Sequence, residues 1–528
     1  MKAKRVLIVG GGSAGWTVAA YLNAALNTRD REDAKISLVE SPDVPRISVG
    51  EATVPNIHRT LAVIGIDELE FMKAVDGTFK ASIRFNNWLR NDNKFYHHPF
   101  SRFGSGPKDD AGKRWLMSDR SVPFMNTISA QPILCEMSLS AKPFEKVNLG
   151  IPVGYAFHMN ALKYADYLRD FSTKRGVTHF LEHVTEVKVK ESGDISAVET
   201  KSGKRLEADL FIDCTGFSAM LSEKALGVKW VDFSQWLLCD RALVMPVPYD
   251  IHYPGLVRPH TMSTAVSSGW IWDIPLQNRR GVGYVHSSAY ISEDAAEQEL
   301  RSYEGAHANA LDTRLIHFKV GMREKAWSRN CISIGLSGGF LEPLESTGLY
   351  LNELAAELLA EHFPFGDDME PFAFRFNRLM ENSFCEILDF INMHYCLTRR
   401  TDTAFWREVA RPERINDRLA AKLEFWRIKP PSISDFVDQV FPGQVDMSSS
   451  AGRPPIDTGR LWNHHSYEAI LYGMDFLSDK CEQRYGVNRP RPAVHKMVLD
   501  AVNNARDKLP PHDVWLKRVL GMTDYPGP

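Results

Sequence analysis

The feature that most constrains the fold lies at the start of the chain, where an apolar run, a glycine cluster and a helical stretch follow one another directly. Arg5-Val-Leu-Ile-Val9 has the β-branched character of a central parallel strand. Gly10, Gly12 and Gly15 follow in G-x-G-x-x-G spacing, and the helical pattern is clear from Trp16. The first glycine permits a tight turn, the second lets backbone approach a pyrophosphate, and the third lets helix and strand pack closely. The pattern predicts a dinucleotide-binding βαβ unit.

A second strand with a terminal acid strengthens this prediction. Lys35-Ile-Ser-Leu-Val-Glu40 reads as a strand, and its last residue is placed to bind ribose hydroxyls. An acid rather than a basic residue at this position suits FAD or NAD over NADP. Ser13 and Ala14 complete the predicted cofactor loop. No second G-x-G-x-x-G follows a strand, so no separate nicotinamide domain is predicted and the electrons must come from elsewhere.

Two later segments also run from a strand into a glycine turn. They are Glu207 to Gly216, near the middle of the chain, and Cys331 to Gly339, near its two-thirds point. Three such segments at these places resemble the FAD-dependent monooxygenase superfamily, in which one FAD lies extended across a single domain. FAD is therefore the predicted cofactor.

Composition excludes several other classes. The 528 residues carry a formal net charge of −3 and no long basic block, so we expect no nucleic-acid partner. There is no apolar run of about 18 residues and no signal-peptide pattern, which predicts a protein that does not enter a membrane. Seven cysteines without a C-x-x-C favour a reducing, cytoplasmic setting.

Four more motifs stand in a fixed order after the glycine loop. They are G-E-A-T at 50–53, F-K at Phe79-Lys80, W-x-W-x-I-P at 270–275 and E-P-L-E-S-T-G at 342–348. With the glycine motif they resemble the flavin-dependent tryptophan halogenase family, over residues 1 to about 420. The resemblance is specific because five motifs agree in order.

The resemblance, with the strand and helix patterns, implies an α/β fold. An FAD-binding domain with a parallel sheet is expected over residues 1–350, interleaved with a mixed substrate-side sheet at about 80–190 and 220–325. A mainly helical region over 351–528 would cap the substrate pocket, since apolar residues recur there at three- and four-residue steps. The turn-rich stretch 441–459 is predicted to be a long loop or lid.

The family reaction follows from the same resemblance. FADH2 from a separate flavin reductase, O2 and chloride or bromide would give hypohalous acid, which halogenates an indole-type carbon by electrophilic aromatic substitution. The matching lysine, Lys80, either forms a chloramine or holds the acid by a hydrogen bond, and its apolar neighbours Phe79 and Ala81 predict a buried amino group. Glu345 would polarise the halogenating species or accept the ring proton. Its alternative role is that of an acid stabilised at a helix N-terminus.

The remaining site residues are also carried over from the family. The W-x-W face would be a packed aromatic wall that keeps substrate from the flavin. The protein is expected to be a monomer or a homodimer. Further flavin contacts are expected at Ala52, Thr53, Leu336 and Leu349, halide contacts at Thr347 and Gly348, and substrate contacts at His97, Phe100 and Trp462.

Paired histidines occur twice, at His97-His98 and His464-His465. No further His, Cys or carboxylate cluster at ligand spacing is recognised beside them, so no metal is expected. Both His464 and His465 are assigned to the core or the surface.

The chain departs from the family at the residues that clamp free tryptophan. Taking Leu461-Trp462-Asn463 as the counterpart of the family's Phe-Trp-Asn, the expected tyrosine pair falls near Ser450 and Ala451, and the glutamate near Asp457. A site without partners for ammonium and carboxylate cannot favour that substrate. Free indole or a larger indole is therefore predicted over L-tryptophan. The rival hypotheses are an FAD-dependent aromatic hydroxylase and a non-catalytic, redox-sensing flavoprotein.

Overall fold

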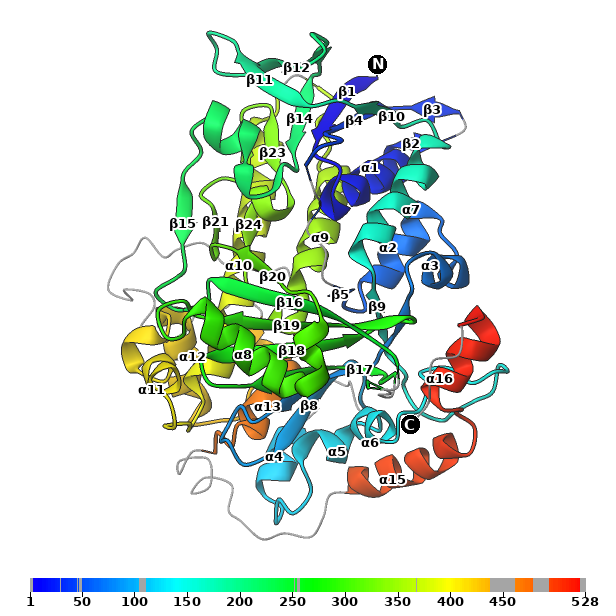
Figure 1. Ribbon diagram of the computed structural model, residues 1–528, viewed down its shortest axis with the longest axis vertical. Helices are drawn as coiled ribbons and strands as arrows, with labels where there is room; N and C mark the ends of the chain where they lie inside the picture. Colours follow the sequence, from blue (N-terminus) through cyan, green and yellow to red (C-terminus); the bar gives the residue numbers. More distant parts are fainter. Residues whose placement is uncertain are drawn as a thin grey trace. The chain divides into compact units, whose positions relative to one another are not determined.

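The computed structural model describes residues 3–522 except 29, 45, 47–49, 104–110, 251, 254–256, 367, 437–460 and 478–492. The chain divides into two compact units (Figure 1). The first contains Met1–Gly77, Met159–Ser234 and Phe318–Phe384; the second contains Thr78–His158, Gln235–His317 and Cys385–Pro528. Each unit is thus assembled from three separate stretches of sequence, while the domain boundary predicted at residue 350 stays a prediction.

The first unit is built on a six-stranded sheet in the order β10-β4-β1-β14-β23-β22. Its pairings are parallel except for that of β22 with β23. The strands are β1 (Lys4–Val9), β4 (Ala34–Glu40), β10 (Thr178–Leu181), β14 (Leu210–Asp213), β22 (Trp327–Ser328) and β23 (Cys331–Ser333). β1 lies between β4 and β14, and its Val6-Leu-Ile-Val9 run is buried, as expected for a central parallel strand.

Helices cover this sheet, and α1 packs against α9. The apolar side chains of α1 are buried on nearly every side, because α2, α7 and α9 all pack against it. The helices are α1 (Ser13–Leu26), α2 (Ile57–Ile64), α3 (Glu68–Ala74), α7 (Ala161–Thr173) and α9 (Thr347–Glu361). The helix after the glycine turn was predicted from Trp16 and begins three residues earlier, at Ser13.

Short strands complete the first unit. One small sheet is β11 (Val184–Val189), β12 (Ile195–Thr200) and β13 (Arg205–Glu207); another is β15 (Trp230–Asp232), β21 (Gly321–Arg323) and β24 (Gly339–Phe340). The first packs its apolar face onto Phe211 and Leu221. The remaining short strands are β2 (Asn27–Thr28), β3 (Arg31–Glu32) and β5 (Glu51–Ala52).

The second unit is built on a seven-stranded sheet in the order β20-β16-β19-β18-β17-β7-β8. Its pairings are antiparallel except for that of β7 with β17. The strands are β7 (Ser82–Asn86), β8 (Phe95–Pro99), β16 (Arg241–Pro248), β17 (His260–Ala265), β18 (Gly269–Pro275), β19 (Arg279–His286) and β20 (Arg314–His317). Beside it, β6 (Thr78–Lys80) pairs with β9 (Ala156–Met159).

The W-x-W-x-I-P motif forms β18, which is buried along its whole length. Trp270 and Trp272 lie on one face with ring centroids 6.1 Å apart, as their two-residue spacing requires. The indole of Trp272 fits against β19 because the facing residue is Gly283, where a Cβ would overlap the ring. Trp270 also packs near Trp88. The motif is a wall of packed aromatic rings.

The described elements after residue 351 are helical, as predicted, and the stretch 441–459 lies outside the described residues. The 27-residue α10 (Glu370–Cys396) has residues in both units. The helices of the second unit are α4 (Ala111–Leu116), α5 (Phe124–Ile128), α6 (Gln131–Glu136), α8 (Glu293–Glu304), α11 (Ala404–Val409), α12 (Asp417–Trp426), α13 (His464–Gly473), α15 (Ala493–Arg506) and α16 (His512–Trp515). Within the described ranges no helix has the length and apolar character needed to cross a bilayer.

Candidate active site

The glycine loop between β1 and α1 has the close contacts that its motif predicts. Gly10 has φ +113°, and a Cβ there would overlap the Cys214 carbonyl. A Cβ on Gly15 would overlap the Gly10 carbonyl oxygen, so only glycine lets the helix approach the turn. Gly12, the N-cap of α1, faces open space and offers no side-chain cap to the helix's first amides. A diphosphate fits here, because those amides can donate to it and, among the described residues, no atom lies within 4 Å of where a Cβ on Gly12 would be.

The predicted ribose acid lies next to this loop. Glu40 ends β4, is 8% exposed, and is so close to Gly11 that a Cβ there would overlap its carboxylate. Arg46 donates to Glu40 Oε2 at 2.7 Å, and His179 Nε2 lies 3.0 Å from Oε1. The carboxylate is therefore fixed beside the turn, and its contact with a ribose stays a prediction.

The third strand-to-glycine turn closes against the start of α1. After β23 the chain passes through η4 (Gly335–Ser337), where Gly335 has φ +76° and the Ser337 hydroxyl donates to the Asp213 carbonyl. A Cβ on Gly335 would lie 2.8 Å from the Cβ of Ala14 in α1. Partly buried Leu336 belongs to this turn. Two segments more than 300 residues apart in sequence thus meet at the predicted flavin loop.

The E-P-L-E-S-T-G stretch forms η5 (Pro343–Glu345) and the start of α9. Its N-cap, Ser346, has left-handed backbone (φ +60°) and makes no side-chain capping bond to the helix. Thr347 is buried, Gly348 is exposed with open space around it, and Leu349 is buried. A helix start of this kind suits a bound anion.

Both carboxylates of this stretch are buried in the first unit. Glu342 is 0% exposed and Glu345 is 1% exposed. Carboxylates this deeply buried are rare outside paired or functional sites. Glu345 lies directly before the N-cap of α9, so its two predicted roles, catalysis and stabilisation at a helix N-terminus, both stay predictions.

Lys80 ends β6 in the second unit and is 0% exposed. The burial predicted from its apolar neighbours is confirmed. Its Nζ lies 5.2 Å from the centroid of the Phe100 ring, a cation–π distance. β9 holds the strand on one side by antiparallel pairing, with Lys80 opposite Ala156. Lysine is among the residues least often fully buried, so this position is exceptional.

A neutral histidine lies near Lys80. The Thr78 hydroxyl donates to the Pro275 carbonyl at 2.6 Å, so it accepts from His158 Nδ1 at 3.0 Å. His158 Nε2 then accepts from the Thr261 hydroxyl at 2.9 Å. Burial and, second, the charge of Lys80 hold the pKa of His158 well below its ordinary value. This network ties the lysine strand to the last residue of the W-x-W-x-I-P motif.

A second histidine, His512, accepts a hydrogen bond from the backbone of β6. The Phe79 N–H donates to His512 Nε2 at 3.2 Å, and His512 Nδ1 donates to the Val257 carbonyl at 2.9 Å. Burial lowers the pKa of His512 to about 4, which keeps Nε2 free of a proton. The Phe79 ring packs on Trp515, in the same short helix α16, with centroids 4.7 Å apart. The strand that carries Lys80 is therefore fixed by the C-terminal helix.

The other predicted substrate residues lie in the second unit. His97 is 4% exposed; its Nδ1 lies 3.0 Å from Ser82 Oγ and its Nε2 3.0 Å from Glu136 Oε1. Burial lowers the pKa of His97 despite this carboxylate. Phe100 follows β8 and is partly buried near Lys80. The contact of His97 and Phe100 with an aromatic substrate stays a prediction.

Comparison with known proteins gives the family. The tryptophan halogenase family model matches residues 5–489. The chain is 35% identical over 491 residues to the tryptophan 6-halogenase of Streptomyces toxytricini, and the match covers 89% of each chain. The chain belongs to the tryptophan halogenase family.

Solved structures agree with this assignment. A tryptophan halogenase from Shewanella frigidimarina superposes with a TM-score of 0.84 at 32% identity and 98% coverage of both chains. A flavin-dependent halogenase from Brevundimonas superposes with a TM-score of 0.81 at 30% identity, covering 98% of this chain and 99% of the other. The predicted α/β fold is confirmed, and this tryptophan halogenase family member is an enzyme whose family implies FAD.

The predicted substrate residue Trp462 is also buried in this halogenase, and its contact with an aromatic substrate stays a prediction. It is 5% exposed and stacks on Phe390 with centroids 3.9 Å apart. Its backbone N–H donates to Glu386, whose pKa burial raises to about 8. The Asn463 side chain accepts from the His465 N–H and caps α13. The predicted counterparts of the tyrosine pair and the glutamate, Ser450, Ala451 and Asp457, lie outside the described residues.

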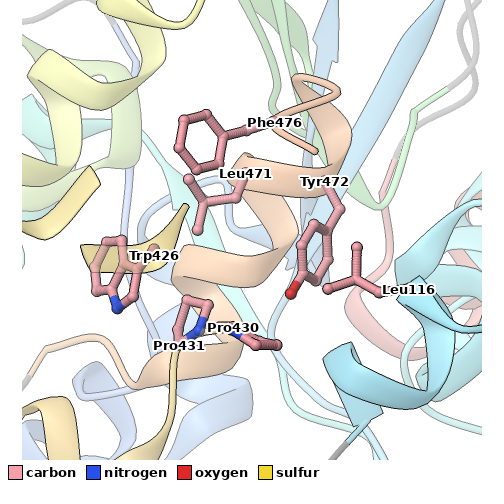
Figure 2. A pocket seen from close by; sticks show the side chains of 7 residues that line it. All are labelled: Leu116, Trp426, Pro430, Pro431, Leu471, Tyr472 and Phe476. Carbon is pink, nitrogen blue, oxygen red and sulfur yellow. The ribbon is translucent and has the colours of Figure 1, made fainter. Parts of the chain in front are cut away.

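One small apolar pocket lies elsewhere in the second unit of the halogenase (Figure 2). It holds about 210 Å³ of empty space, part of it open to solvent. Neither Lys80 nor the predicted substrate residues line it. The lining residues are Leu116, Trp426, Pro430, Pro431, Leu471, Tyr472 and Phe476.

Sequence reasoning missed His158 and His512. His158 lies 80 residues from the threonine it bonds, and His512 lies 433 residues from Phe79. The apolar neighbours of His158 in the strand Ala156–Met159, all four residues of which are buried, give a weak signal for the first, and no local signal marks the second.

Proposed function

We propose that this enzyme halogenates an indole-type aromatic carbon, with Lys80 directing hypohalous acid and Glu345 accepting the ring proton. The observation that carries the proposal is the complete burial of Lys80 beside an aromatic ring and a neutral histidine. A lysine so placed has lost its hydration, and ionisable side chains in buried settings are found often at functional sites.

The Lys80 nitrogen would hold hypohalous acid either by a hydrogen bond or as a covalent chloramine. In the hydrogen-bonded route, the arene carbon attacks the halogen, the halogen–oxygen bond breaks, and the leaving oxygen takes a proton from the ammonium to become water. The ring then loses its proton to Glu345, which restores aromaticity. His158 supports this role because it stays neutral and does not offer a competing cation.

The cofactor side of the reaction belongs to the first unit. Gly10, Gly12 and Gly15 with α1 would hold the diphosphate of FAD, and Glu40 its ribose. Other contacts would come from Ser13, Ala14, Ala52, Thr53, Leu336 and Leu349. When FADH2 from a separate reductase is bound, it would supply the two electrons that activate O2. The activated oxygen would then oxidise chloride or bromide. The first amides of α9, at Thr347 and Gly348, would hold the halide.

The proposed acceptor is free indole or a larger indole rather than L-tryptophan. One observation supports this choice. The side-chain oxygen of Asn463 already caps α13, so it is engaged by the helix rather than left for the clamp expected from the family. Ring stacking by His97 and Phe100 would position the acceptor.

The test supplies the enzyme with FADH2, O2 and bromide together with indole or L-tryptophan, and detects products by mass spectrometry. Monobrominated indole formed faster than bromotryptophan is the expected result. Equal turnover of the two would overturn the substrate proposal. An oxygenated product without bromine would identify a hydroxylase, and FADH2 oxidation without any product would leave the enzyme role itself unsupported.

Lys80→Met tests the proposed role of the lysine. We expect halogenation to fall by at least about 100-fold while the rate of FADH2 oxidation is unchanged, since only the directing group is lost. Lys94→Met is the matched control, because its side chain is 81% exposed before β8. Comparable halogenation by the Lys80 and Lys94 variants would exclude Lys80 from the reaction.

A further inference from the structure

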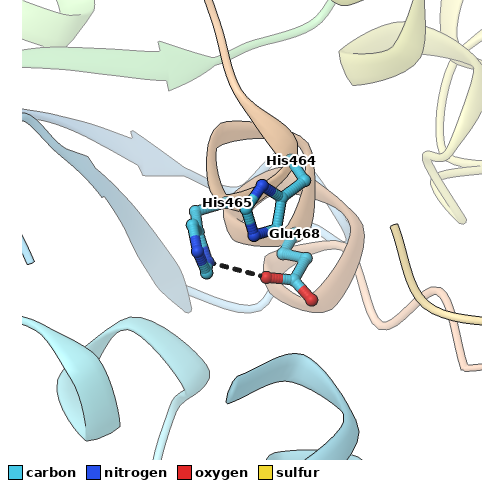
Figure 3. A group of neighbouring side chains, drawn as sticks. All are labelled: His464, His465 and Glu468. Carbon is cyan, nitrogen blue, oxygen red and sulfur yellow. Dashed lines mark ion pairs between the residues drawn. The ribbon is translucent and has the colours of Figure 1, made fainter. Parts of the chain in front are cut away.

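The second unit carries a cluster of ligand-type side chains at the start of α13 that the halogenation proposal does not use. His464, His465 and Glu468 each offer one nitrogen or oxygen atom, and these three atoms lie within 4.8 Å of one another (Figure 3). The side chains are almost wholly buried, with exposed fractions of 6%, 2% and 2%. Removing such groups from water is costly, so their burial in one place requires compensating contacts.

Helix geometry explains why three side chains converge. At about 100° per residue, Glu468 lies about 40° to one side of His464 and about 60° to the other side of His465. The carboxylate therefore projects between the two imidazoles, whose ring centroids are 3.7 Å apart. Asn463 fixes the first turn by accepting from the His465 N–H at 3.0 Å.

The side chains of the cluster are in close contact. His465 Nδ1 lies 2.9 Å from Glu468 Oε2. A metal ion binds the neutral form of an imidazole. The Tyr472 hydroxyl lies 3.4 Å from Glu468 Oε1.

We propose that His464, His465 and Glu468 bind one divalent transition-metal ion of the zinc class. Two imidazoles and one carboxylate are a common ligand set for zinc, with water in the fourth position. Ligand atoms around tetrahedral zinc lie about 3.3 Å apart, so the 2.9 Å pair must open slightly and the widest pair must close by no more than about 1.5 Å. Calcium and magnesium, which prefer oxygen ligands, do not suit it.

The two adjacent histidines alone predicted no metal. Glu468, three residues beyond His465, is the third ligand that the pattern lacked. The site would be structural, since all three ligands lie within the first five residues of α13 and the ion would fix the start of that helix. It does not depend on the proposed halogenation.

The test uses full-length protein stripped of metal with a chelator, then titrated with Zn²⁺ by calorimetry, with bound metal counted by mass spectrometry. Glu468→Gln and His464→Asn are compared with His317→Asn, a control at an exposed histidine of β20. We expect one Zn²⁺ per chain in the unmodified and control proteins, and at least about 100-fold weaker binding in the other two. Zinc, but not magnesium, should raise the melting temperature.

If Glu468→Gln fails to fold, His464→Asn still tests the site, because it leaves the contact between His465 and Glu468 intact. Circular dichroism checks that each variant is folded. Absence of stoichiometric zinc binding in the unmodified protein would overturn the proposal. So would equal zinc affinity in His464→Asn and His317→Asn, since the bound metal would then lie elsewhere.

Discussion

Replacing His512 by leucine tests whether the C-terminal helix positions the lysine strand. The ring of His512 accepts from the Phe79 N–H and donates to the Val257 carbonyl, and it is 0% exposed. Leucine fills much of the same space but makes neither bond. The Phe79 amide, one residue before Lys80, then becomes a buried donor without this acceptor.

The magnitude follows from the cost of a lost acceptor. A buried donor left unsatisfied costs about 1–3 kcal/mol. If that cost falls on local opening of β6, the Phe79 amide hydrogen exchanges about 5- to 150-fold faster. Hydrogen exchange followed by mass spectrometry, on a peptide that covers Thr78–Lys80, measures this directly. His317→Leu, at an exposed position, should leave the exchange unchanged.

The catalytic readout is the ratio of halogenated product to FADH2 oxidised. We expect this ratio to fall in His512→Leu while FADH2 oxidation persists, because only the placement of Lys80 is disturbed. His512→Gln keeps an acceptor that can reach the Phe79 N–H and should recover part of both properties. Unaltered exchange at Phe79, or an equal fall in halogenation and FADH2 oxidation, would refute the reasoning.

Acid provides a second perturbation of the same contact. The pKa of His512 is about 4 in the folded protein, against 6.5 when it is unperturbed, so the unfolded chain binds the proton first as pH falls. Neutral His512 makes its full contribution to the free energy of unfolding above pH 6.5. That contribution is lost progressively toward pH 4, by about 3 kcal/mol in total. His512→Gln should remove this part of the pH dependence, as measured by exchange at Phe79.

Three further outcomes are expected. Glu345→Gln keeps the shape but not the base, and should lower the halogenation rate by about 100-fold without slowing FADH2 oxidation, in a stopped-flow assay. Gly15→Ala places a Cβ against the Gly10 carbonyl and should abolish FAD binding in a fluorescence titration, whereas Gly366→Ala, with open space around it, should not. Burial raises the pKa of Glu353 to about 7. The free energy of unfolding therefore falls by about 3 kcal/mol as the pH rises from 4.5 to 7, because the unfolded chain releases this proton first. Glu353→Gln should remove that loss, as measured in thermal melts at about pH 8.

The flavin-binding unit could be predicted because each part of it is encoded in neighbouring residues. The predicted strand Arg5–Val9 lies within β1, and Glu40 ends β4 as expected. The prediction was less accurate at α9, which begins at Thr347 rather than near Leu351. There the left-handed backbone of Ser346 starts the helix directly after a 3₁₀ turn, a local choice that the apolar periodicity does not report.

The surroundings of Lys80 could be predicted only in part. Its burial followed from Phe79 and Ala81, which are its neighbours in sequence. The histidines that bond to Thr78 and Phe79 come from residues 80 and 433 positions away, and no periodic pattern links such distant positions. Glu468 was not predicted to join the two histidines, because the three side chains converge only across one face of a helix.

The bond from Phe79 to His512 also has a consequence during biosynthesis. A ribosome adding 5–20 residues per second needs about 20 to 90 s to make the chain between these two residues, which are 433 positions apart. Throughout that time the strand that carries Lys80 lacks one of its two lateral partners. A product that stops before α16 can therefore contain every residue of the flavin loop and still have an unfinished lysine strand. Among nascent and truncated products, only those that extend through His512 should couple FADH2 oxidation efficiently to halogenation.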